Sequence, residues 1–241
     1  MIFDGSQINI GYGAQAEVLL YKGYAYKVYK SSYPVEWIEF EKKQQKAVNV
    51  AELCNVKYYD TADPHIIKMD YIDGDTLEKR ARSGDISCFY TLSDAFRLVH
   101  GKNASNINIP HFSDTAGMGL NDSDKTEVLS IISRLSDKME SCVCHLDMHF
   151  LNILLPKDSH DFIIIDWMNA RLAPLVFDYA RTYIIFEEFS KEGLDAYKQI
   201  VLPKLWDYGV DENDFCDAKW VCSIIRNREK RVSSRLVRMM P

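Results

Sequence analysis

One stretch of the sequence, residues 143–183, limits what the chain can fold into more than any other. It is typical of two short strands joined by a polar loop. His145, Asp147 and Asn152 follow the spacing H-x-D-x-x-x-x-N within that loop, and apolar residues come directly after it. The run at 162–165, FIII, is rich in β-branched residues and therefore favours a strand, which ends at Asp166.

Two carboxylates and an amide among these residues, those of Asp147, Asp166 and Asn152, form a set of hard oxygen ligands. Strands joined by a short turn would bring Asp166 and Asn152 within reach of one cation, with Asp147 beside them. Such oxygens suit Mg²⁺ shared with the phosphates of a nucleotide rather than zinc. A carboxylate five residues before the amide can instead orient an attacking hydroxyl, as in kinase-type phosphoryl transfer. The structural alternative is a solvated loop between two core strands.

The segments HLDMHFLN, IDWMNA and FDYAR resemble the catalytic core of the aminoglycoside phosphotransferase and choline kinase superfamily. This superfamily is the small-molecule branch of the protein-kinase-like fold. The resemblance covers nearly the whole chain and implies a two-lobe α+β fold. Residues 1–72 would form a small, β-rich nucleotide-binding lobe, and residues 73–241 a larger helical lobe for catalysis and acceptor binding. Leu146 stands where the family usually has glycine, a difference that concerns the backbone beside Asp147.

The resemblance also implies roles for the polar residues of this core. Asp147 would accept the proton of an attacking hydroxyl or orient it. Asn152 and Asp166 would hold Mg²⁺. Asp178 would brace the catalytic loop through hydrogen bonds rather than touch the metal.

Near the N-terminus, Gly11, Gly13, Ala14 and Ala16 follow a G-x-G-x-x-G pattern in which Ala16 replaces the third glycine. Glycines let a backbone approach phosphates closely, so this loop is expected to cover the nucleotide. A plain hairpin turn explains the pattern equally well. A dinucleotide-binding turn does not, because the following residues continue as a strand, with a turn at Lys22 and Gly23.

Lys27 lies in a segment, AYKV, that resembles the kinase strand whose lysine pairs with the α- and β-phosphates. A helix is expected after Pro34, which is favourable in the first turn. The resemblance favours Glu41 of this helix as the ion-pair partner of Lys27. Glu39 stays open as the alternative.

Two more short strands are expected before residue 70. The residues Asp70, Tyr71 and Ile72 resemble the hinge of the family, where backbone groups bind the adenine ring. The boundary between the lobes is expected near residue 73.

Asp178 comes only twelve residues after Asp166 in the sequence. A protein kinase places a long activation segment at this point to hold a polypeptide substrate. Its absence from the sequence favours a small-molecule acceptor over a protein.

The composition is that of an ordinary globular protein, with 47% apolar and 27% charged residues. No apolar run reaches the ~18 residues that a membrane span requires, and the first residues do not resemble a secretory signal. We therefore expect a cytoplasmic protein. Its six cysteines are expected to be reduced thiols. Cys142 and Cys144 would face one side of a strand, but the sequence offers no second pair to complete a zinc site. His100 is expected to have a structural role, with no partner identified.

Charge is unevenly distributed along the chain. The net charge is −6, and residues 226–241 carry +5, which leaves about −11 on the remainder. This acidic remainder argues against nucleic-acid binding and suits a cationic acceptor. Residues 187–217 contain nine acids: Glu187, Glu188, Glu192, Asp195, Asp207, Asp211, Glu212, Asp214 and Asp217. They are expected either to line an acceptor pocket or to form a solvated face that the basic tail neutralises.

Taken together, these patterns predict transfer of the γ-phosphoryl group of ATP or GTP, with Mg²⁺, to a hydroxyl of a small molecule such as an aminoglycoside or amino alcohol. A compact atypical protein kinase and a non-catalytic nucleotide-binding scaffold stay open as alternatives. No nucleic-acid or membrane partner is expected, and monomer and dimer are both open.

Overall fold

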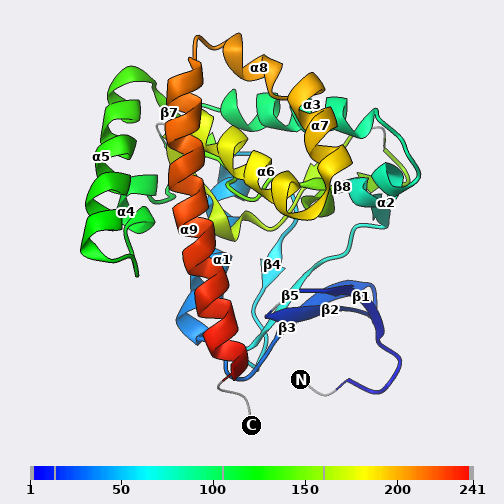
Figure 1. Ribbon diagram of the computed structural model, residues 1–241. Helices are drawn as coiled ribbons and strands as arrows, with labels where there is room; N and C mark the ends of the chain where they lie inside the picture. Colours follow the sequence, from blue (N-terminus) through cyan, green and yellow to red (C-terminus); the bar gives the residue numbers. More distant parts are fainter. Residues whose placement is uncertain (1–2, 14, 105, 160, 239–241) are drawn as a thin grey trace. The chain divides into compact units, whose positions relative to one another are not determined.

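The computed structural model describes residues 3–13, 15–104, 106–159 and 161–238 (Figure 1). The chain forms two compact units. The first comprises the residues up to Asp75 together with Leu154–Met168, and the second comprises Thr76–Ile153 and the chain from Asn169 onward. The lobes expected at 1–72 and 73–241 stay a prediction. The compact units differ from them in assigning Leu154–Met168 to the first unit.

The first unit is built around an antiparallel sheet with the strand order β1-β2-β3-β5-β4. Its strands are β1 (Ile8–Tyr12), β2 (Ala16–Tyr21), β3 (Tyr24–Tyr29), β4 (Tyr58–Tyr59) and β5 (Ile66–Asp70). Lys22 and Gly23 both have positive φ, 48° and 79°, as a two-residue hairpin turn between β2 and β3 requires. The predicted turn at these residues is confirmed.

Helix α1 (Val35–Val50) follows Pro34, as the sequence predicts. Its residue Ile38 is fully buried in an apolar cluster with Tyr29, Tyr33 and Ile67, so the helix shares a core with β3 and β5. The turn of α1 that contains Ile38 therefore packs against β3.

A smaller sheet has the strand order β6-β8-β9, comprising β6 (Gly74–Thr76), β8 (Ile153–Pro156) and β9 (Ile163–Ile164). Strands β6 and β8 approach closely at Gly74. A Cβ atom at Gly74 would lie 2.4 Å from the carbonyl oxygen of Leu155. Only glycine fits at this position without a shift of the backbone.

The second unit is mainly helical. Strands β7 (Ser141–Cys144) and β10 (Arg171–Pro174) form an antiparallel pair in which Cys144 lies opposite Arg171. The helices are α2 (Leu77–Arg82), α3 (Cys88–His100), α4 (Phe112–Ala116), α5 (Asp122–Lys138), α6 (Val176–Phe189), α7 (Lys191–Ile200), α8 (Pro203–Trp206) and α9 (Glu212–Arg238), with short 3₁₀ turns η1 (Phe150–Asn152) and η2 (Trp167–Asn169).

Helix α6 forms the centre of the second unit. Its residues from Val176 to Phe186 are all buried. The ring of Tyr179 stacks on that of Phe96 from α3, with ring centroids 4.5 Å apart. A helix buried on every side belongs to a core rather than to a surface, so the polar residues of α6 need partners inside the protein.

All six cysteines are free thiols, as expected. None of the helices in the described part of the chain is long and apolar enough to cross a membrane.

The close approach at Gly74 gives a testable prediction. The variant Gly74→Ala places a methyl group against backbone atoms of Leu155 and Pro156, so we expect the free energy of unfolding to fall by about 1–3 kcal/mol. Urea denaturation would measure the change. Gly11→Ala is the matched control, because the nearest atom to its new Cβ would lie at an ordinary 3.5 Å. Equal stability of the two variants would contradict the prediction.

Candidate active site

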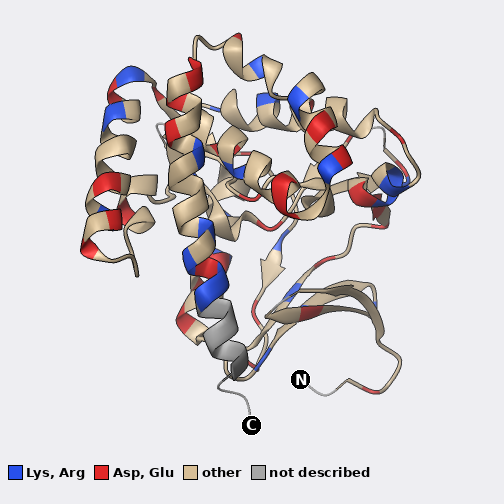
Figure 2. Ribbon diagram, viewed as in Figure 1, with Lys and Arg blue, Asp and Glu red and all other residues tan. Residues whose placement is uncertain are grey.

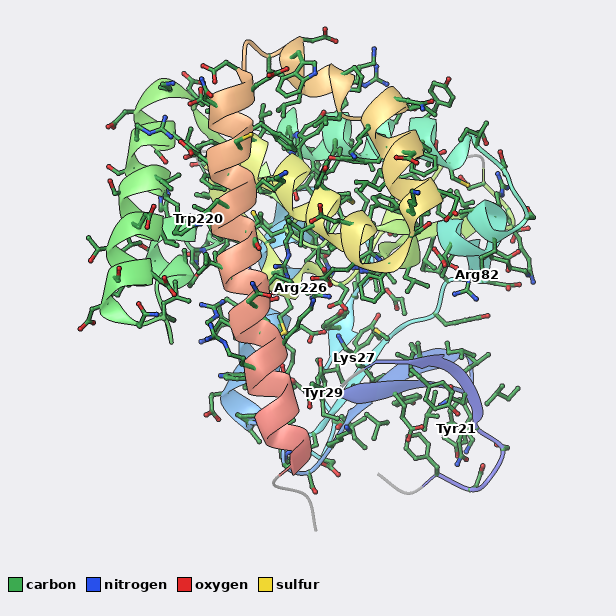
Figure 3. The ribbon with its side chains drawn as sticks, in the orientation of Figure 1. Tyr21, Lys27, Tyr29, Arg82, Trp220 and Arg226 are labelled. Carbon is green, nitrogen blue, oxygen red and sulfur yellow. The ribbon has the colours of Figure 1, made fainter. Side chains whose placement is uncertain are left out.

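In the first unit, Lys27 on β3 joins two carboxylates. Its Nζ atom lies 2.8 Å from Oε1 of Glu41 on α1 and 3.3 Å from Oδ1 of Asp166, which follows β9. Burial alone would lower the pKa of Lys27, but the charges of Asp166 and Glu41 hold it well above its ordinary value. Lys27, labelled in Figure 3, therefore carries a positive charge on β3, where it lies opposite Ile67 of the neighbouring strand β5.

Glu41 is 1% exposed and is held from several sides. The hydroxyl of Tyr29 donates to its Oε2 atom, and the hydroxyl of Tyr58 lies 3.4 Å from Oε1. A buried carboxylate needs such partners, since an unpaired charge in a protein interior is costly. Glu39, the alternative that the sequence left open, is half exposed and pairs with Lys42 at 2.5 Å. In the structure, the ion-pair partner of Lys27 on α1 is therefore Glu41 and not Glu39.

The remaining predicted nucleotide residues lie along the same sheet. Gly11 and Tyr12 are the last two residues of β1. The N–H of Gly13 donates to the carbonyl oxygen of Ala16, the first residue of β2, at 2.8 Å. Ala14 lies outside the described residues. The covering of phosphates by this loop stays a prediction.

The predicted hinge residues begin with Asp70, the last residue of β5, and continue with the two residues after it. The carboxylate of Asp70 accepts hydrogen bonds from the N–H of Lys57 and the hydroxyl of Tyr59, both at 2.9 Å. The backbone N–H of Asp70 also donates to the carbonyl oxygen of Lys57 at 3.1 Å, so both the side chain and this N–H group are used within the sheet. Tyr71 and Ile72 are half-buried. Adenine binding by residues 70–72 stays a prediction.

In the second unit, the loop after β7 brings Asp147 and Asn152 together. The Nδ2 atom of Asn152 donates to the backbone carbonyl of Asp147 at 2.9 Å and lies 3.5 Å from its carboxylate. His149 lies 3.8 Å from the same carboxylate. The H-x-D-x-x-x-x-N spacing thus folds into a compact turn in which the side chain of Asp147 stays 23% exposed.

The surroundings of Asp147 favour its ionised form. Burial would raise the pKa of this carboxyl, but the hydrogen bond and charge of His149, with the charges of Arg181 and His145, hold it well below its ordinary value. Asp147 therefore carries a negative charge at neutral pH, as a group that accepts a hydrogen bond from a hydroxyl must.

Asp178 on α6 braces this loop, as the sequence predicts. Its carboxylate accepts hydrogen bonds from the N–H of His145 at 2.9 Å and of Leu146 at 2.8 Å. It also accepts the Nε2–H of His100 at 3.0 Å, because an ionised carboxylate can only accept. The partner of His100 that the sequence did not reveal is thus Asp178, 78 residues further along the chain.

Arg181 is a residue of this site that sequence reasoning missed. Its side chain is 6% exposed, and Nη2 lies 2.5 Å from Oε2 of Glu229 on α9. It lies one turn after Asp178 on α6, where the next residue, Thr182, donates its hydroxyl to the carbonyl of Met148 at 2.8 Å. The available signal was an arginine within the long buried run of α6, since arginine is almost never fully buried unless it is paired.

The predicted metal ligands have the donor chemistry that Mg²⁺ requires. The Nδ2 atom of Asn152 donates to a backbone carbonyl, so the metal role predicted for Asn152 would fall to its amide oxygen. The carboxylate of Asp166 is 41% exposed and contacts Lys27 through one oxygen. Each residue thus offers a hard oxygen.

The nine acids at 187–217 do not form one uniform surface. Asp214 is buried and pairs with Arg134 and Lys138 of α5, and Asp217 also pairs with Arg134. Glu188 pairs with two basic residues of α9, Arg226 at 3.0 Å and Lys230 at 2.6 Å. Figure 2 shows that α9 carries both acidic and basic residues. Part of the acidic group is therefore neutralised by the protein itself, including by the start of the basic tail.

The backbone at Leu146 gives a second prediction. Leu146 has φ +57°, in the left-handed region that costs a non-glycine residue about 1–2 kcal/mol. We expect Leu146→Gly to be at least as stable as Leu146→Ala in urea denaturation, since both lose the buried side chain but only glycine relieves the strain. The same pair of variants at Val143, fully buried in a strand, is the control. There, glycine should be less stable than alanine by about 0.5–1 kcal/mol. If the glycine variant were less stable than the alanine variant at Leu146 as well as at Val143, the prediction would be contradicted.

Comparison with known proteins agrees with this geometry. Residues 116–210 match the phosphotransferase enzyme family. No curated protein is significantly similar to this chain in sequence.

Several solved structures share the fold. The choline kinase LicA from Streptococcus pneumoniae has a TM-score of 0.65 at 16% identity, over 98% of this chain and 87% of LicA. Another structure of LicA, in complex with AMP, has a TM-score of 0.64 at 17% identity, over 95% of this chain and 84% of that one. The aminoglycoside phosphotransferase APH(3'')-Id from Streptomyces rimosus has a TM-score of 0.62 at 15% identity, over 92% of this chain and 93% of that one. The predicted resemblance to the aminoglycoside phosphotransferase and choline kinase superfamily is thereby confirmed, as is the kinase-like α+β fold.

Proposed function

We propose that this protein transfers the γ-phosphoryl group of a nucleoside triphosphate to a hydroxyl of a small molecule, with Mg²⁺. The observation that carries the proposal is the charge cluster of Lys27, Glu41 and Asp166, which is buried at Glu41 and exposed at Asp166. A structural ion pair needs one carboxylate for one ammonium. Here the second carboxylate, on Asp166, is 41% exposed, so Lys27 and Asp166 form an accessible pair of opposite charges that suits a phosphate and its cation.

On this proposal the nucleotide binds to the first unit. Lys27 pairs with the α- and β-phosphates, Glu41 fixes its position, and Gly11 and Gly13 cover the phosphates with backbone N–H groups. The AMP bound by LicA supports nucleotide binding. ATP and GTP are both compatible with the residues described. ATP as donor also suits the expected cytoplasmic location.

Mg²⁺ would be held by the oxygens of Asn152 and Asp166. A bound Mg²⁺ would neutralise the charge on the transferring phosphoryl group and bridge the phosphate oxygens. The hydrogen bond from the Nδ2 atom of Asn152 to the carbonyl of Asp147 supports this role, because it leaves the amide oxygen as the ligand atom.

Asp147 would accept the hydrogen bond of the acceptor hydroxyl and orient it for attack. Its depressed pKa keeps it ionised, and its partial exposure leaves it accessible. Because the loop is held by Asp178 and Thr182 from α6, the carboxylate is positioned by the core of the unit rather than by the loop alone. Positioning and charge then supply most of the catalysis.

A small-molecule acceptor is favoured over a protein by the segment between Asp166 and Asp178. It consists of η2, β10 and short connections, so it contains no long segment to hold a polypeptide. The compact atypical protein kinase stays the alternative within the enzymes. A non-catalytic scaffold is disfavoured because Lys27, Asp147, Asn152 and Asp166 are all present.

An amine-bearing acceptor is the finer part of the proposal. Four acids of the 187–217 group form ion pairs with the protein's own basic residues. The other five are exposed and form no ion pair among the residues described: Glu187, Glu192, Asp195, Asp207 and Glu212. Exposed pairs contribute about 0–1 kcal/mol each and weaken with salt, so we expect a modest, salt-dependent preference for cationic acceptors.

The metal assignment is tested first, with Asp166→Ala. This variant removes one Mg²⁺ ligand while Lys27 keeps its ion pair with Glu41, so we expect a folded protein whose nucleotide binding no longer depends on Mg²⁺. Isothermal titration calorimetry with ATP, with and without Mg²⁺, measures this. The control is Asp161→Ala, which removes an exposed carboxylate from the same segment. Unchanged Mg·ATP affinity in Asp166→Ala would rule the assignment out.

The reaction is tested with labelled ATP, Mg²⁺ and a panel of aminoglycosides, amino alcohols, neutral polyols and casein. We expect label on small molecules, and a turnover at least about a hundredfold lower in Asp147→Asn with nucleotide affinity nearly unchanged. Asp137→Asn, at an exposed position of α5, should behave as the wild type.

The other outcomes of this panel separate the alternatives. Labelled casein would indicate a protein kinase, and nucleotide binding without transfer would indicate a scaffold. Equal binding of amines and polyols at low salt would exclude the cationic acceptor.

A further inference from the structure

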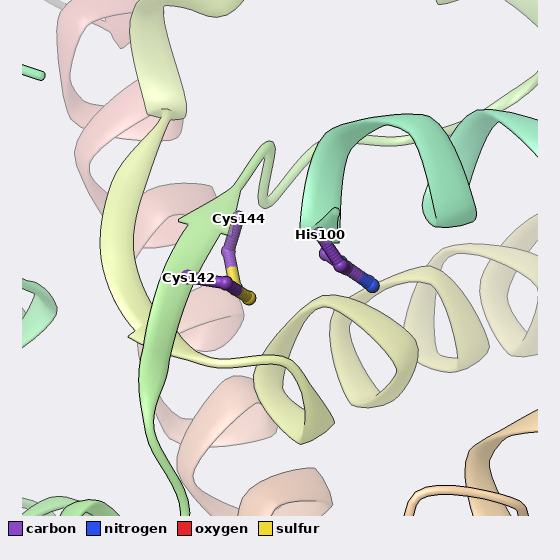
Figure 4. A group of neighbouring side chains, drawn as sticks. All are labelled: His100, Cys142 and Cys144. Carbon is purple, nitrogen blue, oxygen red and sulfur yellow. The ribbon is translucent and has the colours of Figure 1, made fainter. Parts of the chain in front are cut away.

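Behind the catalytic loop, three potential metal ligands lie together. His100 ends α3, and Cys142 and Cys144 lie on β7; their ligand atoms are all within 4.8 Å of one another (Figure 4). All three belong to the second compact unit. Sequence spacing identified the two thiols only as structural, because the third ligand comes from a distant helix.

The fold explains why these residues meet. Alternation along β7 turns Cys142 and Cys144 to one face, and their sulfur atoms lie 3.9 Å apart. Both thiols also lie within 3.6 Å of the carbonyl oxygen of Ala173 on the paired strand β10. Two thiolates about 2.3 Å from one tetrahedral Zn²⁺ would be separated by about 3.8 Å. The sulfur pair therefore already has the spacing of metal ligands.

His100 has the hydrogen bonding that a metal-binding histidine requires. Its side chain is 2% exposed, and its Nε2 atom is engaged by Asp178 at 3.0 Å. Its Nδ1 atom is buried and has no hydrogen-bond partner among the described residues. An imidazole that donates one N–H to a carboxylate presents the lone pair of the other nitrogen, and this arrangement typically orients a metal ligand.

We propose that His100, Cys142 and Cys144 bind a thiophilic d¹⁰ cation, for which Zn²⁺ is the natural example. Two sulfurs and one imidazole nitrogen select such an ion over Mg²⁺ or Ca²⁺, which prefer oxygen. This site is separate from the Mg²⁺ proposed for catalysis, since it shares no residue with it.

Asp178 connects this site to the catalytic loop. The same carboxylate that fixes His100 accepts the N–H groups of His145 and Leu146, directly before Asp147. A cation at His100 would hold the imidazole, and through it Asp178, in one position. The ion would thus stabilise the geometry of the loop without touching a substrate.

The test uses Co²⁺ as a spectroscopic probe for the full-length, reduced protein without nucleotide. We expect one equivalent of Co²⁺ to bind with a thiolate-to-metal charge-transfer band that Zn²⁺ then displaces. Cys142→Ser and Cys144→Ser should lose the band and bind at least about a hundredfold more weakly, because each loses one of three ligands. Cys88→Ser is the matched control for Cys144→Ser, since both cysteines are fully buried and the thiol of Cys88 also lies near a carbonyl, that of Leu77. It should retain the band.

A second measurement needs no variant. Zn²⁺ should protect Cys142 and Cys144 of the wild type from alkylation in partly denaturing urea at a concentration where Cys88 still reacts, as read by mass spectrometry. The proposal is overturned if the wild type shows neither the charge-transfer band nor the protection from alkylation. It is also overturned if the band persists in both Cys142→Ser and Cys144→Ser. Because no step of the test involves phosphoryl transfer, its failure is distinguishable from a failure of the proposed enzymatic function.

Discussion

A buried carboxylate on a buried helix organises the second unit. Asp178 is fully buried and receives three hydrogen bonds, two from the backbone at 145 and 146 and one from His100. Hydrogen bonds to a charged acceptor contribute more than neutral ones, and a buried charge without them would be strongly destabilising. The loop that carries Asp147 is therefore tied to the core of the protein. Because the brace acts on the backbone, it tolerates the unusual conformation of Leu146.

The first unit also contains a largely buried charge that needs partners, and this charge is the positive one of Lys27. Lys27 is mostly buried on the sheet, and the charges of Asp166 and of Glu41 on α1 keep it protonated. Glu41 in turn depends on the hydroxyl groups of Tyr29 and Tyr58. The ion pair thus spans a strand and a helix that share the core around Ile38. The stability of the fold and the orientation of the lysine have the same origin.

Helices α6 and α9 add a third network of charges. Arg181 of α6 pairs with Glu229 of α9, and Arg226 of α9, which is labelled in Figure 3, pairs with Glu188 of α6. The network neutralises part of the acidic group in the sequence, and it also brings a buried positive charge near Asp147. The acidic composition of residues 187–217 therefore has a structural component as well as any role in binding an acceptor.

Much of this protein was determined by local patterns in its sequence. The hairpin turn at Lys22 and Gly23, the five strands and one helix before residue 73 and the spacing of Asp147 and Asn152 depend on neighbouring residues, so periodicity and motif spacing predict them. The choice of Glu41 over Glu39 needed the tertiary structure, because a rotation of one residue along a helix changes which face meets Lys27. The same is true of His100, whose partners Asp178, Cys142 and Cys144 are distant along the chain, and of Arg181 with Glu229. Such pairs form only when helices pack, and no local periodicity specifies which buried polar groups will face one another.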